Sequence, residues 1–439
     1  MLMTIVVFII ILGILVFVHE LGHFVVARRN GIKAEEFGFG FPPRIFGIQF
    51  LEGKDKHKFS KIESVEIKTT DIKSGKDEII QEVITEKIHN YEKMMPIKKW
   101  RIIWGGKDGD NENEQRDLQE AHKKRFAGGT IYSLNWLPIG GFVRIKGEDG
   151  EGKNDEDSFA SKSAWVRIKV LSAGVIMNFI LAWILLSVTF MLGSYQDVTG
   201  KNISGSKILV ESIEKNSPAE KMGMVAGDFI IQNGEGLFFS KVEQVQQYIN
   251  SNKGKEIELV IQRGKKQLTL AGIPRLETEI GQGALGISGF GEVVKVKYSF
   301  FESIWMGLKE IGNMFLIVGG IFVNLFRGEN TGIEVMGPVG LAIFTGQIIP
   351  LGLVFILRFI AIFSVNLGII NALPFPALDG GRILFILIEK IKGKPISQKI
   401  EQVFHNIGMM LLIVLMVFIT LREIFTPEFI DKIKGVVVQ

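Results

Sequence analysis

The stretch "FVHELGHFVVARR", residues 17–29, places two histidines and a glutamate inside an otherwise apolar run. An ionisable side chain in the middle of a membrane span costs on the order of 2.5 to 3.5 kcal/mol even on lenient insertion scales, so such groups are usually functional. Arg28 and Arg29 close the run, no basic residue precedes it and no small-residue cleavage site follows it. These features favour a membrane helix over a signal peptide.

The composition extends this interpretation to the whole chain. Its 439 residues are 47% hydrophobic, and the net charge of +4 comes from basic and acidic residues that are interspersed, which argues against a nucleic-acid partner. Cysteine is absent, so any metal must be held by His, Asp or Glu. Four apolar runs approach the length of a membrane span, at about 4–27, 169–193, 352–372 and 406–422. We predict a polytopic α-helical membrane protein with about four transmembrane helices.

The distribution of basic residues predicts the orientation of these spans. By the positive-inside rule, the flanks that carry Lys and Arg face the cytoplasm: Arg28, Arg29, Lys33, Lys162, Arg167, Lys169, Arg382, Lys390, Lys392 and Lys394. Residues 194–350 then lie outside. A further apolar stretch, 311–326, is short for a span, and we interpret it as an interfacial or re-entrant helix. If this stretch does not cross, the chain crosses the membrane three times before residue 373, and residues near 380 return to the depth of His23.

The polar segments predict a small sheet and an insertion. Residues 51–129 are rich in balanced charge and are predicted to be a charged, solvated cytoplasmic insertion. The flanking stretches 37–50 and 130–148 are rich in Phe, Ile, Val and Gly, which favours strands that form a hairpin or small sheet on the cytoplasmic side. We predict six segments along the chain. They are the first span with the first strand (1–50), the charged insertion (51–129), the second part of the hairpin with the second span (130–195), a separate domain (200–280), an interfacial segment (290–350) and the last two spans (351–439).

The sequence pattern of residues 200–280 is typical of a separate α+β domain. Short alternating runs such as "KILVESIE" and "EIELVIQRG" predict about five strands, with one helix at "SKVEQVQQYINSN". The stretch "SPAEKMGMVAGDFIIQNG", residues 217–234, resembles the core of bacterial PDZ domains. That resemblance implies binding of an extended peptide or a protein terminus at a sheet edge.

The opening stretch also carries a metal-binding pattern. His19, Glu20 and His23 form H-E-x-x-H, and the i, i+4 spacing puts both imidazoles on one helix face, where both reach a single zinc ion. The Glu20 carboxylate can then act on a water molecule bound to that ion. Zinc of this kind needs a third protein ligand and an open position.

Asp379 is the candidate third ligand. The segment "SVNLGIINALPFPALDGGR", residues 364–382, runs from a span through two prolines to this acid, and a helix broken at membrane depth must line protein or a wet cavity. The other interpretation of Asp379 is the N-cap of a helix over 380–390. We interpret His57, His89 and His122 as solvated, and His405 as an interfacial residue at the start of the last span.

Together these motifs resemble the site-2 protease family of intramembrane zinc metalloproteases, most closely its RseP-type branch. The resemblance rests on "HELGH", "LPIGGFV" (137–143), "AGVIMNF" (173–179), one PDZ-like segment and "NALPFPALDGG" (371–381). It implies hydrolysis of a peptide bond in or near the transmembrane segment of single-pass proteins, such as anti-sigma factors or remnant signal peptides. It also implies a bacterial cytoplasmic membrane, with the active site in the cytoplasmic half.

Carried over by matching motif, His19, His23 and Asp379 are expected to bind Zn²⁺ and Glu20 to act as the base. The amides of three asparagines are expected to hold the substrate or to join the helices: Asn178, Asn366 and Asn371. Gly140, Gly141 and Phe142 are expected either to offer a strand edge to the unwound substrate or to form a purely structural hairpin. Two alternatives from other classes are a non-catalytic PDZ-bearing receptor or scaffold with a structural metal site, and a metal transporter.

Overall fold

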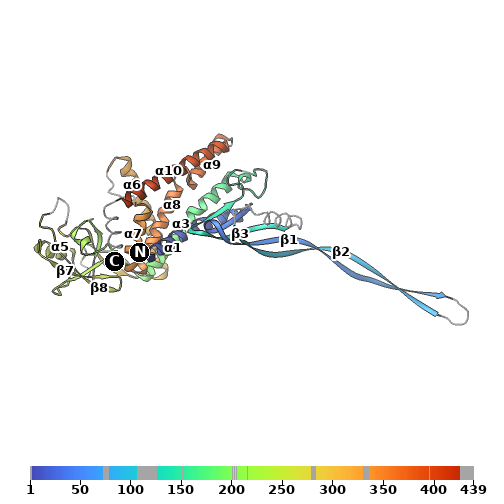
Figure 1. Ribbon diagram of the computed structural model, residues 1–439, viewed down its shortest axis with the longest axis horizontal. Coiled ribbons are helices and arrows are strands. Elements are labelled where there is room, and N and C mark those ends of the chain that lie inside the picture. The colour runs from blue at the N-terminus through green and yellow to red at the C-terminus, as the bar shows by residue number, and fades with distance from the viewer. Residues whose placement is uncertain are drawn as a thin grey trace. The chain divides into compact units, whose positions relative to one another are not determined.

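The computed structural model describes residues 2–72, 79–105, 126–150, 152–199, 201, 203, 205–214, 216–277, 283–329, 336–394 and 396–425 (Figure 1). The chain divides into two compact units: a first unit of Met1–Ile32 and Lys146–Gln439, and a second unit of Lys33–Ile145. His57, His89 and His122, which are predicted to be solvated, lie outside the side chains that the structure describes.

Among the described residues of the first unit, five helices are long and apolar enough to cross a membrane: α1 (Leu2–Arg29), α3 (Ala164–Leu192), α6 (Phe300–Phe326), α8 (Leu353–Ala372) and α10 (Gln398–Ile424). Two shorter helices lie between them in sequence: α7 (Pro338–Ile348), which continues as a 3-10 turn over Ile349–Leu351, and α9 (Asp379–Lys392). A 3-10 turn over Phe159–Ser161 precedes α3. The chain is thus a multi-pass helical membrane protein with additional β structure.

The helix α6 is longer than the sequence pattern predicts. We expected a 16-residue apolar segment at 311–326, whereas the helix has 27 residues and begins at Phe300. Ser299 and Glu302 form a capping box at its start, in which the Glu302 carboxylate accepts the Ser299 N–H at 3.0 Å. A helix of this length spans about 40 Å, more than a ~30 Å hydrocarbon core, so length no longer argues against a crossing.

The helix α3 lies at the centre of the first unit and contacts α1, α6, α8 and α9. One apolar cluster joins α3 to α6 and α8 through Leu186, Ile311 and Val365. Between α1 and α3 the backbones approach closely, because a Cβ at Gly22 would lie 2.4 Å from the carbonyl oxygen of Ala173. Glycine at this point therefore permits the α1–α3 contact on which the site depends.

The six-stranded domain, residues 194–296, has the sheet order β4-β9-β5-β6-β7-β8, with neighbouring strands antiparallel. Its strands are β4 (Ser194–Asp197), β5 (Lys207–Ile213), β6 (Phe229–Asn233), β7 (Ile257–Arg263), β8 (Lys266–Gly272) and β9 (Ile287–Val296), with helices α4 (Pro218–Lys221) and α5 (Val242–Ser251). Its core is aliphatic, with Ile208, Leu259 and Ile261 fully buried. Strands and helices are present across 200–280, as the pattern predicts, but β4 and all of β9 lie outside the predicted bounds.

The second unit is a sheet of three long strands in the order β2-β1-β3: β1 (Ala34–Ile72), β2 (Ile79–Trp104) and β3 (Phe126–Ile145). The strands predicted at 37–50 and 130–148 are present within β1 and β3. The structure adds β2 and the outer half of β1, both within the predicted insertion. Residues 36–39 of β1 pair both with 131–134 and with 141–144 of β3, so this part of β1 lies between two segments of β3.

One face of the second unit is apolar. On β1 and β2, Phe46 faces Trp104, Ile48 faces Ile102 and Phe50 faces Trp100 across the ladder. On β3 the face continues with Tyr132 and Leu134, which lie opposite Ile48 and Phe46. We call these eight residues the apolar face; three of its side chains are more than half exposed, Phe50, Trp100 and Trp104.

Candidate metal centre

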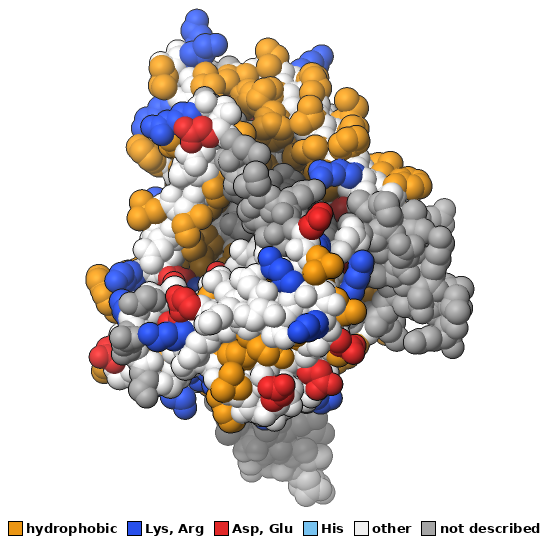
Figure 2. Space-filling model, turned by 90° about the vertical axis from the view of Figure 1, so that its left-hand side faces the viewer, with side chains coloured by type: hydrophobic (Ala, Val, Ile, Leu, Met, Phe, Trp, Pro, Cys, Tyr) orange, Lys and Arg blue, Asp and Glu red, His pale blue; other side chains and the backbone are white. Residues whose placement is uncertain are grey.

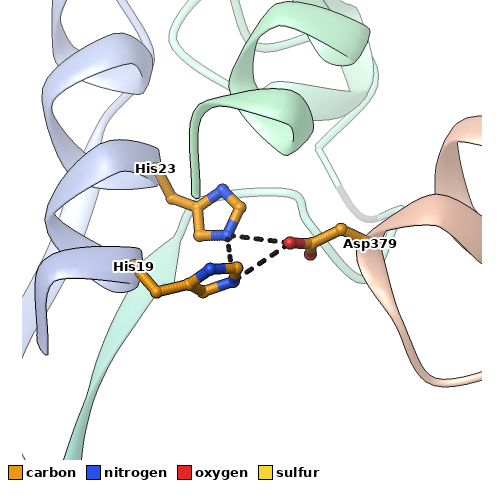
Figure 3. A group of neighbouring side chains, drawn as sticks. All are labelled: His19, His23 and Asp379. Atoms are coloured by element: carbon orange, nitrogen blue, oxygen red, sulfur yellow. Dashed lines mark hydrogen bonds and ion pairs between the residues drawn. The ribbon is translucent and has the colours of Figure 1, made fainter. Parts of the chain in front are cut away.

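Three candidate ligands from the two ends of the chain meet in the first unit (Figure 3). His19 and His23 project from α1, and Asp379 is the first residue of α9. The Asp379 Oδ2 atom lies 3.1 Å from His19 Nε2 and 3.3 Å from His23 Nε2, and the two Nε2 atoms are 3.2 Å apart. Both histidines are buried. Two nitrogens and one carboxylate oxygen therefore converge on one point.

This donor set fits zinc. Two imidazoles and one carboxylate are the usual protein ligands of a catalytic zinc ion, which keeps a fourth position open. The ligand atoms all lie within 4.8 Å of one another, a spacing that a single ion can bridge. Within the described residues, Asp379 Oδ2 is buried without a hydrogen-bond donor other than these imidazoles. Such a carboxylate oxygen requires a positive partner, which a metal ion supplies.

The second nitrogen of each histidine is held by α3. His23 Nδ1 lies 2.8 Å from the Val170 carbonyl oxygen, so it donates there and leaves Nε2 to the metal. The amide nitrogen Nδ2 of Asn178 lies 3.1 Å from His19 Nδ1, and Asn178 Oδ1 has no hydrogen-bond partner among the described residues. With the Asn178 carbonyl turned toward it, the amide accepts the Nδ1 proton and the otherwise unpaired Oδ1 atom is satisfied. Asn178 is completely buried, so this contact favours orientation of His19 over contact with a substrate.

Glycines allow the close packing around the ligands. A Cβ at Gly174 of α3 would lie 2.4 Å from His23 Nε2 and 2.7 Å from His19 Cε1. A Cβ at Gly380 would lie 2.3 Å from the carbonyl oxygens of Ala372 and Leu373, at the end of α8. Because glycine has no side chain at these two positions, α3 can pack against both imidazoles and α9 can start against the end of α8.

Two charged residues to which the sequence assigned no role at the metal centre, Arg382 and Glu148, lie beside it. Arg382, one turn after Asp379 in α9, forms an ion pair with Glu148. Burial lowers the pKa of the Arg382 guanidinium, but the carboxylates of Glu148 and Asp379 outweigh this effect and leave the pKa above its ordinary value. Glu20 lies within electrostatic reach of His19, His23, Asp379 and Glu148. The predicted base is thus next to the candidate ligands.

The other predicted site residues are less directly placed. Asn366 is exposed and Asn371 half-buried on α8, and within the described residues neither has a hydrogen bond to the three candidate ligands. Gly140, Gly141 and Phe142 belong to the second unit, where Gly141 pairs with Phe39 and Phe142 with Gly38. Ser364, which no sequence pattern indicated, donates its hydroxyl to the backbone carbonyl oxygen of Asn178 at 2.7 Å and joins α8 to α3 beside the centre.

Known proteins resemble this chain along most of its length. A family model described as Peptidase family M50 matches residues 7–85 and 120–415. The regulator of sigma-W protease RasP of Bacillus subtilis is 29% identical over 435 residues, which cover 96% of this chain and 98% of that protein. The zinc metalloprotease RasP of Bacillus licheniformis is 32% identical over 441 residues, with coverage of 96% and 98%. A putative zinc metalloprotease of Agrobacterium fabrum is 28% identical and covers 95% of this chain and 94% of its own length.

Proposed function

Because this chain belongs to peptidase family M50, the site-2 protease family of intramembrane zinc metalloproteases, we propose that it cleaves single-pass membrane proteins in or near their transmembrane segments. The enzyme class and the zinc cofactor follow from the family and from relatives named zinc metalloproteases. The family match supports the protease over the receptor, scaffold and transporter alternatives. The relative from Bacillus subtilis is named for regulation of sigma-W, which supports anti-sigma factors as one substrate class.

In this proposal His19 and His23, through Nε2, and Asp379, through its carboxylate, hold the zinc ion. The single observation that supports the assignment most is the convergence of these three side chains from α1 and α9 on one point. Bound zinc supplies Lewis-acid activation of a water molecule and of the scissile carbonyl. Glu20, beside the ligands, would be the base that takes a proton from the attacking water and gives it to the leaving amine. The Val170 carbonyl oxygen, and Asn178 Oδ1 with the amide turned toward His19, hold the imidazoles in the tautomer that directs Nε2 to the metal.

Cleavage requires the substrate helix to unwind, because its backbone amides are bonded internally. We propose that residues 140–142 receive the extended chain as an added strand. In support, β3 pairs with β1 there and lies at the edge of the described sheet, and Gly140 and Gly141 bring no side chain to that edge. Asn366 and Asn371 are proposed to bind the substrate backbone, with Asn366 presenting an exposed amide on α8.

We further propose that the six-stranded domain is a PDZ domain outside the cell that binds peptide or protein ends. The Ser-Pro-Ala and Gly-Asp residues of the PDZ-like stretch make structural contacts: Ser217 caps α4 by accepting the Glu220 N–H, and buried Asp228 pairs with Arg263 at 2.6 Å. The domain bounds given by sequence remain a prediction.

A multi-pass location in the bilayer agrees with the exposed apolar side chains of the first unit, which gather in the upper part of Figure 2. The exposed apolar side chains of α6 include Leu316, Ile317 and Leu325. We propose the bacterial cytoplasmic membrane as its location, with the metal centre in the cytoplasmic half. The apolar face of the second unit, rich in Trp and Tyr, suits the membrane–water interface, where these residues are enriched.

The test compares wild type with Glu20→Gln in reconstituted liposomes that contain a panel of single-pass substrates. The variant retains the ligands, so we expect normal zinc content with cleavage reduced by several orders of magnitude, and in cells we expect single-pass stubs to accumulate. Wild-type rates of cleavage by Glu20→Gln would refute the proposal that this carboxylate is the base. Loss of zinc from His19→Ala and Asp379→Asn tests the ligands separately.

A further inference from the structure

The segment that delivers Asp379 to the metal centre has a strained backbone. Residues 373–378, "LPFPAL", connect the end of α8 to the start of α9. Ala377 has φ 72°, in the left-handed region that residues with a Cβ rarely adopt. Such a conformation persists only when its surroundings hold it. The residue lies two positions before Asp379, so whatever holds it also affects the direction of the Asp379 carboxylate.

In addition to the hydrogen bond that closes its turn, Ala377 has a contact from the last helix. The backbone N–H of Ala377 donates to His405 Nδ1 of α10 at 2.9 Å. The His405 ring is packed beside Phe385 of α9, with ring centroids 5.7 Å apart, and beside Phe404 at 5.9 Å. An Nδ1 atom that accepts a hydrogen bond carries no proton, so His405 is the Nε2–H tautomer in this arrangement. The interfacial role expected from the sequence does not account for this bond.

A second residue of α10 contacts the same turn. Gly408 lies three residues after His405, on the same helix face. A Cβ at Gly408 would lie 2.1 Å from Pro376 Cβ and 2.8 Å from the Pro376 carbonyl carbon, so the helix backbone packs directly on the turn. The turn is closed by its own hydrogen bond, from the Leu378 N–H to the Phe375 carbonyl oxygen at 3.3 Å, and α10 adds one hydrogen bond and one close backbone contact to residues 376 and 377.

We propose that His405 is a positioning residue: by binding the Ala377 N–H it fixes the turn that aims Asp379 Oδ2 at His19 and His23. The inference rests on the proposed function, in which Asp379 is a zinc ligand. The chemical reason is that a carboxylate ligand must be directed before the metal binds, and partners beyond the ligands typically change metal affinity by about 10- to 100-fold. The glycine at 408 makes the approach of His405 possible.

The experiment measures zinc affinity, by competition with a chelator, and cleavage in the full-length protein in detergent. For His405→Ala we expect zinc affinity to fall on the order of tenfold. His405→Asn should retain most of the affinity, because its Oδ1 can accept the Ala377 N–H. Asn406→Ala, at the exposed neighbouring position on α10, is the matched control and should bind zinc as wild type does.

The decisive variant combines His405→Ala with Ala377→Gly. Glycine adopts φ 72° without strain, so the double variant should recover much of the lost zinc affinity, which a general packing role of His405 would not predict. Wild-type zinc affinity in His405→Ala, or no recovery in the double variant, would overturn the inference. If Asp379→Asn also keeps wild-type affinity, the ligand assignment itself fails; if Asp379→Asn loses zinc while His405→Ala does not, only the positioning role fails.

Discussion

The substitution Gly174→Ala tests the packing that brings α3 to the metal centre. The added methyl group would lie 2.4 Å from His23 Nε2 and 2.8 Å from His19 Nε2, whereas carbon and nitrogen atoms pack at about 3.5 Å. The imidazoles or α3 must therefore move by about 1 Å, and a displacement of about 1 Å at a catalytic centre costs on the order of 100-fold in rate. That factor corresponds to about 2.7 kcal/mol of transition-state stabilisation.

The assay compares kcat/KM for a reconstituted single-pass substrate and zinc content by elemental analysis. Gly320→Ala is the matched control, because a Cβ there, also within a long apolar helix, meets nothing within 4 Å. Replacing Gly by Ala favours helix by about 1 kcal/mol in both variants, so a loss confined to Gly174→Ala cannot come from a weakened helix. Wild-type cleavage and zinc content in Gly174→Ala would refute the reasoning.

Three further substitutions test other parts of the molecule. Asn178→Ala leaves His19 Nδ1 without its partner, and we expect zinc affinity to fall at least tenfold in chelator competition, with Asn178→Asp retaining more than Asn178→Ala. Arg263→Ala leaves the buried Asp228 carboxylate unpaired, and we expect about 3 to 5 kcal/mol less protection of the six-stranded domain in hydrogen exchange, with zinc content unchanged. Gly141→Pro removes a backbone N–H from the proposed receiving strand, so cleavage should fall severely while zinc content stays normal; unchanged cleavage would favour the purely structural hairpin.

The sequence was sufficient to find the candidate ligands because their pattern is local. His19 and His23 are one helical turn apart, and Asp379 stands out because two prolines break the helix before it. Gly174 and His405 gave no comparable signal. A glycine within an apolar helix and a histidine at a helix start each have ordinary explanations, and only the approach of α3 and α10 to the ligands gives them a role.

The length of α6 could have been predicted better. Its first eleven residues contain Glu302, Lys309 and Glu310, which hid the helix from a search for apolar runs, although Ser299 and Glu302 have the spacing of a capping box. Within the insertion, β2 was missed because frequent charged residues suppress the average hydropathy on which a strand is recognised. Alternation alone is a weak signal when one face of a strand is strongly charged.

The two histidines of residues 17–29 have partners that come from two other helices. His23 binds a carbonyl oxygen of α3, His19 lies against the α3 amide of Asn178, and both face the α9 carboxylate of Asp379. A buried polar group is costly until its partner is in place. Helix α1 by itself therefore carries an unfavourable polar cluster, and α3 and α9 must pack against it before that cost is offset. Correct packing of the helices and formation of the metal centre thus stabilise each other, and Gly22, Gly174 and Gly380 permit that packing.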